Sequence, residues 1–464
     1  MVRMLYFPYT GGGLRIGALG RRAKRRWSLK RAPRKPVGSE TSSPGTRQPI
    51  PGGSSLRESL HTRRFAHPSL GLVIAATALV LSLGYLQKLP CFTGPLQTRQ
   101  FHWMCFTDIV AVNERGVGGP GKVPYLESQF EYPVLTGGVV YLAARLGSSR
   151  FTFFTWTSVL LGGLGVVTAW ALHQLVGGRA LMFAFAPTLL AYAFFNWDLL
   201  AVALAVLATT LYVRDRMAIS GALLGLGTAA KLFPGLLLIP FTLGLWSCPK
   251  RKEASVLVGS AAATWLAVNL PVSIISPRGW AYAFRYQSSR GTDIYTLWAL
   301  PERLLHFLWP AGLLNLLWLG AFLVVGVVAW RWARSRRPGF PAWTFGFPLI
   351  AAFLLTSKAY SPVYSLWLLP WFAIALPDWR AFVAFEAADM AVFVTVFQWS
   401  GGHLPFLALE LSVVARALVL LTCLILWIRS RGPRGEEGEG AATMGSRPSP
   451  GRDNERHAVE TSQE

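Results

Sequence analysis

Long apolar runs separated by short polar connectors dominate the chain. Three of them, 70–86, 159–176 and 313–330, reach or approach the about 20 residues that a helix needs to cross a bilayer core. Others have only about 14–16 residues, which is enough where a helix ends in a protein-lined or water-filled cavity. The runs that can span are 68–87, 151–175, 180–195, 199–213, 218–230, 233–247, 254–274, 312–332, 341–356, 363–376, 381–398 and 406–428. The pattern predicts an all-α polytopic membrane protein with about 12 transmembrane helices.

The run 132–147 is ambiguous, and the basic connectors decide how it is interpreted. If it spans, the connectors with Arg214 and with Lys250–Lys252 fall outside. If it lies on the outer surface, every basic connector falls on the side of the N-terminal tail. Cytoplasmic loops retain Lys and Arg, so the second topology is preferred. It makes 132–147 a juxtamembrane interfacial helix and places both tails in the cytoplasm.

Composition and charge agree with this class of protein. The chain is 52% hydrophobic and 14% charged, where a soluble domain carries about a quarter charged residues. The net charge of +23 is concentrated in the tails and connectors, and no nucleic-acid motif accompanies it. We therefore expect the lipid bilayer, and no nucleic acid, as partner. The predicted domains are a disordered basic tail (1–66), a transmembrane catalytic domain (67–430) and a disordered tail (431–464).

The first outer connection, 88–150, is too long for a simple linker. Asp108 lies there among apolar neighbours, and Glu131 precedes the interfacial run. A carboxylate at a membrane-facing cavity can act as a general base on a hydroxyl group, whereas the usual fate of a loop acid is solvation. We favour the base for Asp108, because ionisable groups at membrane depth are costly. For Glu114 and Glu127 we favour solvation.

Four further outward positions carry charge. Asp198 joins two short spans and could bind a sugar hydroxyl, orient a lysine or cap the following helix. Lys231 ends a run of small residues that permits close helix packing, and it could hold a lipid phosphate or simply snorkel. Together with Arg290 and Lys358 it places positive charge outside, against the orientation bias. These cations favour an anionic lipid ligand.

The chain has four cysteines, and Cys91 and Cys105 share the first outer connection. An oxidising compartment favours a disulfide between them, which would close a loop of about 15 residues worth about 3 kcal/mol. Two free thiols are the alternative. The sequence contains no Walker A, HExxH or GxSxG motif, which argues against an ATPase or a zinc protease.

At these residues the sequence resembles the polyprenyl-phosphate-dependent glycosyltransferases of the GT-C superfamily, and most of all the bacterial glycosyltransferase family 87. The resemblance covers most of 68–428 and neither tail. The matching stretches are CFTDIVAV (105–112), GKVPYLESQFEYPVLTG (121–137), FNWDLLAVALA (195–205), GLGTAAKLFPGLLL (225–238) and TSKAYSPVYSLWLLPWF (356–372).

The resemblance implies a GT-C bundle whose first loop supplies an acidic catalytic base, here Asp108. It also implies a polyprenyl-phosphate-sugar donor, typically the mannose derivative, used on the extracytoplasmic face of the cell membrane, with a glycolipid or glycan acceptor. Lys231, with Arg290 or Lys358, would stabilise the departing lipid phosphate. Glu131 and Asp198 are second candidates, for sugar or acceptor contacts. No cofactor is expected, although a single Asp in place of an adjacent acidic pair leaves metal involvement open.

Two other classes of protein remain open. A transporter or flippase of a lipid-linked glycan would also use outward cations, but it needs sites that open to both faces, and the inner connectors show none. A non-catalytic envelope scaffold would use its tails to bind partners. The donor sugar, the linkage and the oligomeric state do not follow from the sequence.

Overall fold

Helices form all the regular structure that the chain shows in the described residues. The computed structural model describes residues 68–93, 96–119, 121–247 and 249–430, all within Ser55–Glu464, one of the two units into which the chain divides. Over these ranges there is no β-strand, only an isolated bridge between Pro124 and Ser128. The tails expected to be disordered, 1–66 and 431–464, lie outside the described residues.

Long apolar helices match the longest predicted spans. Six are long and apolar enough to cross a membrane among the residues described. They are α2 (Leu70–Lys88), α6 (Arg150–Val176), α13 (Arg251–Ile275), α16 (Ala311–Arg336), α19 (Trp379–Ser400) and α20 (Phe406–Arg429). Shorter apolar elements match the other spans: α9 (Asp198–Val213), α10 (Met217–Ala230), α11 (Phe233–Leu236) with α12 (Leu238–Ser247), η4 (Ala342–Phe345) with α17 (Gly346–Thr356), and η5 (Pro362–Trp367) with α18 (Leu369–Ala375). The predicted all-α polytopic membrane fold is confirmed.

The predicted span 180–195 is wrong as a continuous helix. It divides into η3 (Gly177–Ala180), α7 (Leu181–Ala184) and α8 (Pro187–Tyr192). Pro187 lacks an N–H and disfavours the helical conformation at the preceding residue, and Ala186 is indeed extended, with ψ 121°. A short turn follows α8, and its backbone carbonyls are available to accept hydrogen bonds from other segments.

Small residues bring α10 and α13 into direct contact, as the run 221–235 predicts. A Cβ atom at Gly221 would lie 2.2 Å from the carbonyl oxygen of Leu257, and one at Gly225 would lie 2.4 Å from that of Ala261. Backbones can approach this closely only where no side chain intervenes. The contact fixes the end of α10, where Lys231 stands.

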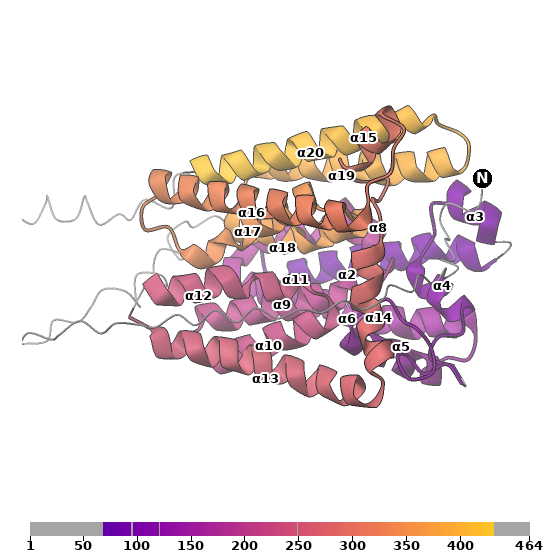
Figure 1. Ribbon diagram of the computed structural model, residues 1–464, viewed down its shortest axis with the longest axis horizontal. Helices are drawn as coiled ribbons and strands as arrows, with labels where there is room; N and C mark the ends of the chain where they lie inside the picture. The colour runs from indigo at the N-terminus through magenta and orange to yellow at the C-terminus, as the bar shows by residue number, and fades with distance from the viewer. Residues whose placement is uncertain (1–67, 94–95, 120, 248, 431–464) are drawn as a thin grey trace, which may run out of the picture. The chain divides into compact units, whose positions relative to one another are not determined.

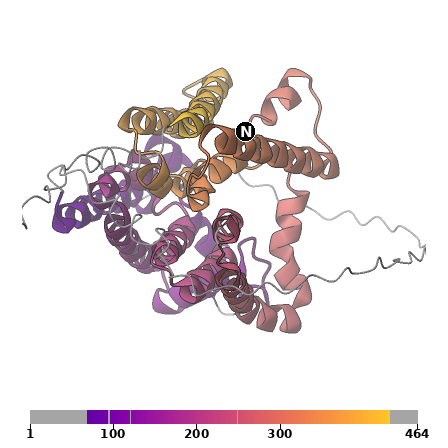
Figure 2. The same ribbon diagram turned by 90° about the vertical axis from the view of Figure 1, so that its left-hand side faces the viewer.

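Two long connections contain further helices. The 88–150 connection holds α3 (Leu96–His102), α4 (Asp108–Glu114) and α5 (Val134–Leu146), and α5 occupies the run expected to be interfacial. Its two cysteines, Cys91 and Cys105, form a disulfide with Cα atoms 5.8 Å apart. The 276–310 connection holds α14 (Pro277–Ser289) and α15 (Ala299–Leu304), which the run pattern does not predict. In Figures 1 and 2, α14 runs across the ends of the long helices.

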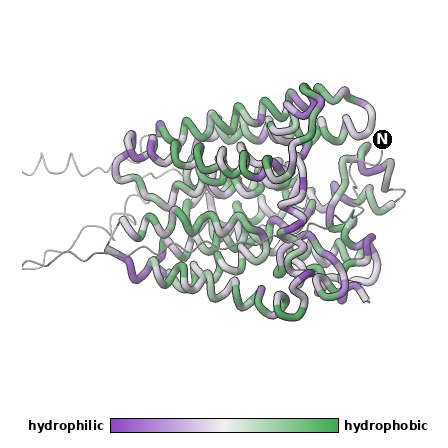
Figure 3. The backbone as a smooth tube through the Cα atoms, in the orientation of Figure 1, coloured by the Kyte–Doolittle hydropathy of each residue, from purple (hydrophilic) through white to green (hydrophobic). Residues whose placement is uncertain are grey.

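The basic connectors lie together at one end of the helices. Arg214 bonds Gln174 at 3.5 Å, Lys250 pairs with Asp215 at 2.8 Å, and Arg337 donates to the backbone of the α20 end. Figure 1 shows the end of α12, the start of α13 and the ends of α16 and α20 at this end, and α4, α5 and α14 at the opposite one. Figure 3 shows apolar colour along the helices between the two polar ends. The short basic connectors from which the topology was predicted therefore share one end of the fold.

Candidate active site

Asp108 is held at the start of α4 by the turn that follows α8. The hydroxyl of Thr107 donates to the carbonyl of Phe194 at 2.7 Å, and the N–H of Asp108 donates to that of Phe195 at 2.8 Å. Thr107 also caps α4 by accepting from the N–H of Ile109 at 3.2 Å. The break in the 180–195 segment supplies the two carbonyls. Asp108 is thereby fixed beside the turn that carries Asp198.

Tyr132 is the direct partner of the Asp108 carboxylate. Its hydroxyl donates to Oδ2 of Asp108 at 3.1 Å. Burial raises the pKa of Asp108 to about 6, and the nearby charges of Glu131 and Asp198 act in the same direction. The hydrogen bond from Tyr132 and the positive charge of Lys231 lower the pKa. A carboxyl group with a pKa near 6 is suited to take a proton close to neutral pH.

Lys231 and Asp198 form an ion pair next to Tyr132. Nζ of Lys231 lies 2.6 Å from Oδ1 of Asp198, and the side chain of Asp198 is fully buried. The other carboxylate oxygen accepts from Nε1 of Trp367 at 2.9 Å. The helix cap precedes Asp198, at Trp197, and the Asp198 side chain makes no capping bond. Of the three interpretations of Asp198, the contact with a lysine is the one that the geometry provides.

Aromatic rings enclose the Lys231 ammonium group. It lies 5.0 Å from the ring centre of Tyr132, 4.8 Å from that of Tyr364 and 6.0 Å from that of Trp367. Such cation–π contacts stabilise a desolvated cation. A hydroxyl of α5 reinforces the arrangement, because Thr136 donates to the carbonyl of Ala230, directly before Lys231, at 2.8 Å. Lys231 is therefore a well-fixed cation, unlike a snorkelling side chain.

Arg290 and Lys358 form a second cationic cluster. The Arg290 guanidinium pairs with Asp293 at 2.5 Å, and Nζ of Lys358 donates to the backbone carbonyl of Arg290 at 2.6 Å. Lys358 is only 5% exposed, and burial lowers its pKa to about 8, with the charge of Arg290 adding to the effect. Arg290 also acts electrostatically on Tyr364, whose ring contacts Lys231. The two clusters are thus neighbours.

The remaining acids of the 88–150 connection have structural partners. Glu131 forms a two-point contact with Arg115, at 2.5 and 3.2 Å. Glu114 pairs with Arg150 at 3.0 Å, and Glu127 accepts from a backbone N–H at 2.9 Å. Glu131 is near enough for its charge to act on Asp108, but its own hydrogen bonds are to Arg115. Asp108, Asp198 and Lys231 are brought together, while Glu131 stands at the edge.

Sequence reasoning did not single out the aromatic members of the site. Tyr132, Tyr364 and Trp367 all lie in stretches that carry the family resemblance, but in a chain with 13 Tyr and 19 Trp their residue types gave no signal. It also overlooked Asp389 and Arg416, which form an ion pair inside α19 and α20. For these a signal existed, because charged residues within spans are rare and costly. No group of three or more His, Cys, Asp or Glu side chains positioned to hold a metal ion occurs in the described part of the chain.

The fold and the site define a polytopic membrane protein with an acid–base and cation cluster at one end of its helices. Residues 130–362, just over half of the chain, match the family model of glycosyltransferase family 87. The chain belongs to this family and is a membrane glycosyltransferase. The matched range includes Glu131, Tyr132, Asp198, Lys231, Arg290 and Lys358. Asp108 lies upstream of it.

Two other comparisons concern the solved structures and the curated proteins. The apo crystal structure of ArnT from Cupriavidus metallidurans is similar with a TM-score of 0.40 and 16% sequence identity, over 80% of this chain and 79% of that one. A search among curated proteins gave no match.

Proposed function

We propose that the protein transfers a sugar, mannose, from a polyprenyl-phosphate donor to a glycolipid or glycan acceptor on the extracytoplasmic face of the cell membrane, with both tails in the cytoplasm. Asp108 is the general base. The observation that carries the proposal is a half-buried carboxyl group with a pKa near 6, close to the fixed cation Lys231, with Arg290 and Lys358 in a neighbouring cluster, at the end of the helices opposite the basic connectors.

The reaction is a single displacement. A lone pair of the acceptor hydroxyl oxygen forms the bond to the anomeric carbon, and its proton passes to Asp108. The bond between the anomeric carbon and the phosphate oxygen breaks, and its electron pair leaves with the polyprenyl phosphate. One carboxylate and one displacement invert the configuration at the anomeric carbon. A cation beside the leaving phosphate stabilises the charge that develops there.

The cations differ in how far they are already neutralised. Lys231 is paired with Asp198 and Arg290 with Asp293. Within the described residues, Lys358 makes its hydrogen bonds to the backbone carbonyls of Ser288 and Arg290. Of the three cations, Lys358 therefore has the least compensated charge, and an anionic phosphate would be stabilised most by binding next to it. We assign Lys358 and Arg290 to the phosphate. Lys231 then orients Asp198 and Tyr132 and completes the positive side of the site.

Replacement of Asp108 by asparagine tests the proposal. Asparagine keeps the shape and accepts the Tyr132 hydrogen bond but cannot take the proton. With labelled polyprenyl-phosphate-mannose in isolated membranes, Asp108→Asn should reduce turnover by at least about a thousandfold, within the range of lost general-base catalysis. Expression and donor binding should stay at the wild-type level. Glu131→Gln is the matched control and should keep substantial turnover.

Two results would contradict the proposal. Near-normal turnover of Asp108→Asn together with an inactive Glu131→Gln would reverse the roles of the two acids. Movement of the labelled lipid across the membrane without cleavage of the sugar–phosphate bond would instead identify a transporter.

A further inference from the structure

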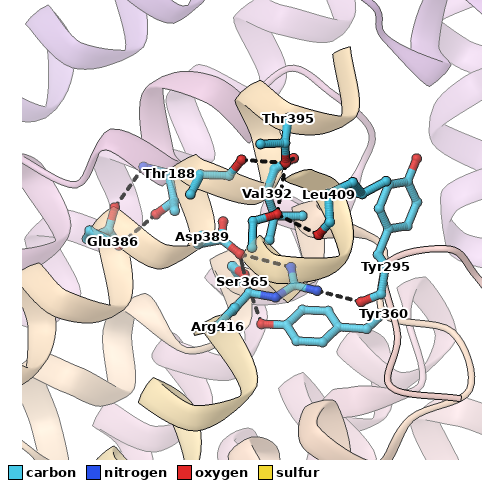
Figure 4. A network of polar contacts seen from close by, with 12 residues as sticks. Thr188, Tyr295, Tyr360, Ser365, Glu386, Asp389, Val392, Thr395, Leu409 and Arg416 are labelled. Carbon is cyan, nitrogen blue, oxygen red and sulfur yellow. Dashed lines mark hydrogen bonds and ion pairs between the residues drawn. The ribbon is translucent and has the colours of Figure 1, made fainter. Parts of the chain in front are cut away.

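A buried ion pair joins the last two membrane helices. A guanidinium nitrogen of Arg416 on α20 lies 3.1 Å from Oδ1 of Asp389 on α19, and the two side chains are 2% and 0% exposed. Figure 4 shows the pair among the helices, with polar partners around it. Charges inside a membrane segment are costly unless they are paired and fully bonded. Ion pairs of this kind can often be replaced by apolar residues without loss of stability, so stability alone is a weak explanation.

The same two side chains reach beyond their own helices. The other guanidinium nitrogen of Arg416 donates to the backbone carbonyl of Tyr295 at 2.7 Å. Its planar group lies 3.7 Å from the ring centre of Tyr360. Asp389 accepts from the hydroxyl of Ser365 at 2.6 Å, and that hydroxyl is 3.0 Å from the hydroxyl of Tyr360. Figure 4 shows these contacts converging on the ion pair. They attach the 276–310 connection and η5 to α19 and α20.

Both attached segments carry residues of the candidate site. Tyr364 directly precedes Ser365 in η5, and the next turn of η5 supplies Trp367, which binds Asp198. In the 276–310 connection, Tyr295 follows closely after Asp293, the partner of Arg290. The ion pair therefore holds the aromatic wall of Lys231 on one side and the Arg290 cluster on the other.

We propose that Arg416, together with Asp389, is a positioning residue that sets the phosphate-binding side of the site by fixing η5 and the 276–310 connection to the membrane helices. This inference rests on the proposed function for the identity of the donor. Arginine suits the role because its guanidinium group donates hydrogen bonds in two directions, while the flat face of the group stacks on the ring of Tyr360. A lysine has the charge but lacks this geometry.

Glu386 offers a matched comparison on the same helix. It is a buried acid one turn before Asp389, and its carboxylate accepts from the N–H and the hydroxyl of Thr188, both at 2.9 Å. These bonds tie α19 to α8 and touch neither η5 nor the 276–310 connection. Loss of Glu386 thus destabilises the fold while leaving in place the hydrogen bonds of Asp389 and Arg416 to Ser365 and Tyr295.

The test compares three variants in the full-length protein. Removal of Arg416 alone would leave the Asp389 charge unpaired in the membrane, so the double variant Asp389→Asn/Arg416→Met is used. Arg416→Lys keeps the pair but cannot also reach Tyr295. Glu386→Ala is the control. Thermal unfolding, amide hydrogen exchange of peptides 290–298 and 360–368, and kcat and KM for polyprenyl-phosphate-mannose are measured.

The double variant should unfold no more easily than Glu386→Ala, yet its amide hydrogens should exchange faster in both peptides. Its KM for the donor should rise about tenfold, which is the effect of one lost charge-assisted hydrogen bond. Arg416→Lys should loosen 290–298 more than 360–368. Glu386→Ala should change neither peptide nor the KM. Because Asp108 and Tyr132 are untouched, the acid limb of the pH profile should not move.

Unchanged exchange in both peptides of the double variant would overturn the proposal. An equal rise in KM for Glu386→Ala would do the same, because it would show a general effect of destabilisation. The exchange measurement needs no turnover. If the wild-type protein fails to use the donor, the proposed function fails, and exchange still decides whether Arg416 fixes the two segments.

Discussion

Replacement of Tyr132 by phenylalanine should shift the acid limb of the pH–kcat/KM profile to higher pH. The limb reports the pKa of the essential base in the free enzyme. In the proposed mechanism Asp108 acts in its ionised form, so activity should be present above its pKa, about 6 in the folded protein, and should be lost as the pH falls through that value. The hydroxyl of Tyr132 donates to the carboxylate at 3.1 Å and stabilises the ionised form.

The size of the shift follows from that single bond. A hydrogen bond to a charged group contributes about 1.5–3 kcal/mol, and one pKa unit corresponds to about 1.4 kcal/mol. At the lower end of that range, loss of the hydroxyl should raise the midpoint of the limb by about one pH unit, from about 6 to about 7. The ring itself remains and keeps its edge contact with Trp197 and its position under Lys231. The fold should therefore persist.

The assay is initial-rate transfer with a labelled lipid-linked donor across pH 4.5–8.5, in matched detergent conditions. Glu131→Gln is the control of opposite sign, because the charge of Glu131 raises the pKa of Asp108 and its removal should shift the limb to lower pH. That shift should be the smaller of the two, since Arg115 already neutralises Glu131. A wild-type limb near pH 4, or a shift of the phenylalanine variant to lower pH, would show that Asp108 is not the titrating base.

Three further changes test other parts of the structure. Lys231→Met should destabilise the protein by about 3–5 kcal/mol, because it leaves Asp198 buried without its cation. The double variant Lys231→Met/Asp198→Asn should regain much of the lost stability in thermal unfolding, while its transfer activity stays low. Tyr125→Phe removes the hydroxyl that bonds the backbone of Tyr132 and the next residue at 2.9 and 2.7 Å, and should lower kcat about tenfold with wild-type donor binding; an unchanged kcat would refute that link. Cys91→Ser should lower the free energy of unfolding by about 3 kcal/mol, and a reductant should reproduce the loss in the wild-type protein but cause no further loss in the variant.

The spans could be predicted because length and apolarity determine them directly. The exception is the segment 180–195, where Pro187 interrupts the continuous helix that the apolar run alone predicts. The prediction that 132–147, now α5, does not span came from the distribution of basic connectors alone. A span there would have placed basic connectors outside the cytoplasm. The structure keeps those connectors at one end. These successes concern features that one segment of sequence can specify.

The contacts of the site depend on segments far apart in the chain, and here the sequence left alternatives. Asp198 had three interpretations, and only the fold brings Lys231 to it. Lys231 was predicted to contact a phosphate, which stays a prediction; in the structure it pairs with the Asp198 carboxylate, and for that reason we propose Lys358 and Arg290 as the main phosphate contacts. Tyr132 shared a quoted motif with Glu131, but nothing in the spacing indicated which of the two would meet Asp108.

The charge balance of the site suggests why a carboxyl group with a raised pKa is useful there. Asp108 lies among the charges of Glu131, Asp198 and Lys231, and the neighbouring cluster holds Asp293, Arg290 and Lys358. A bound phosphodiester adds a negative charge to these groups, and that charge should raise the pKa of Asp108 further in the complex. The acid limb of kcat, which reports the complex, should then lie at higher pH than that of kcat/KM. Comparison of the two profiles for one preparation measures this difference. A kcat limb at the same or a lower pH would contradict the expectation that the donor phosphate binds close enough to Asp108 to raise its pKa.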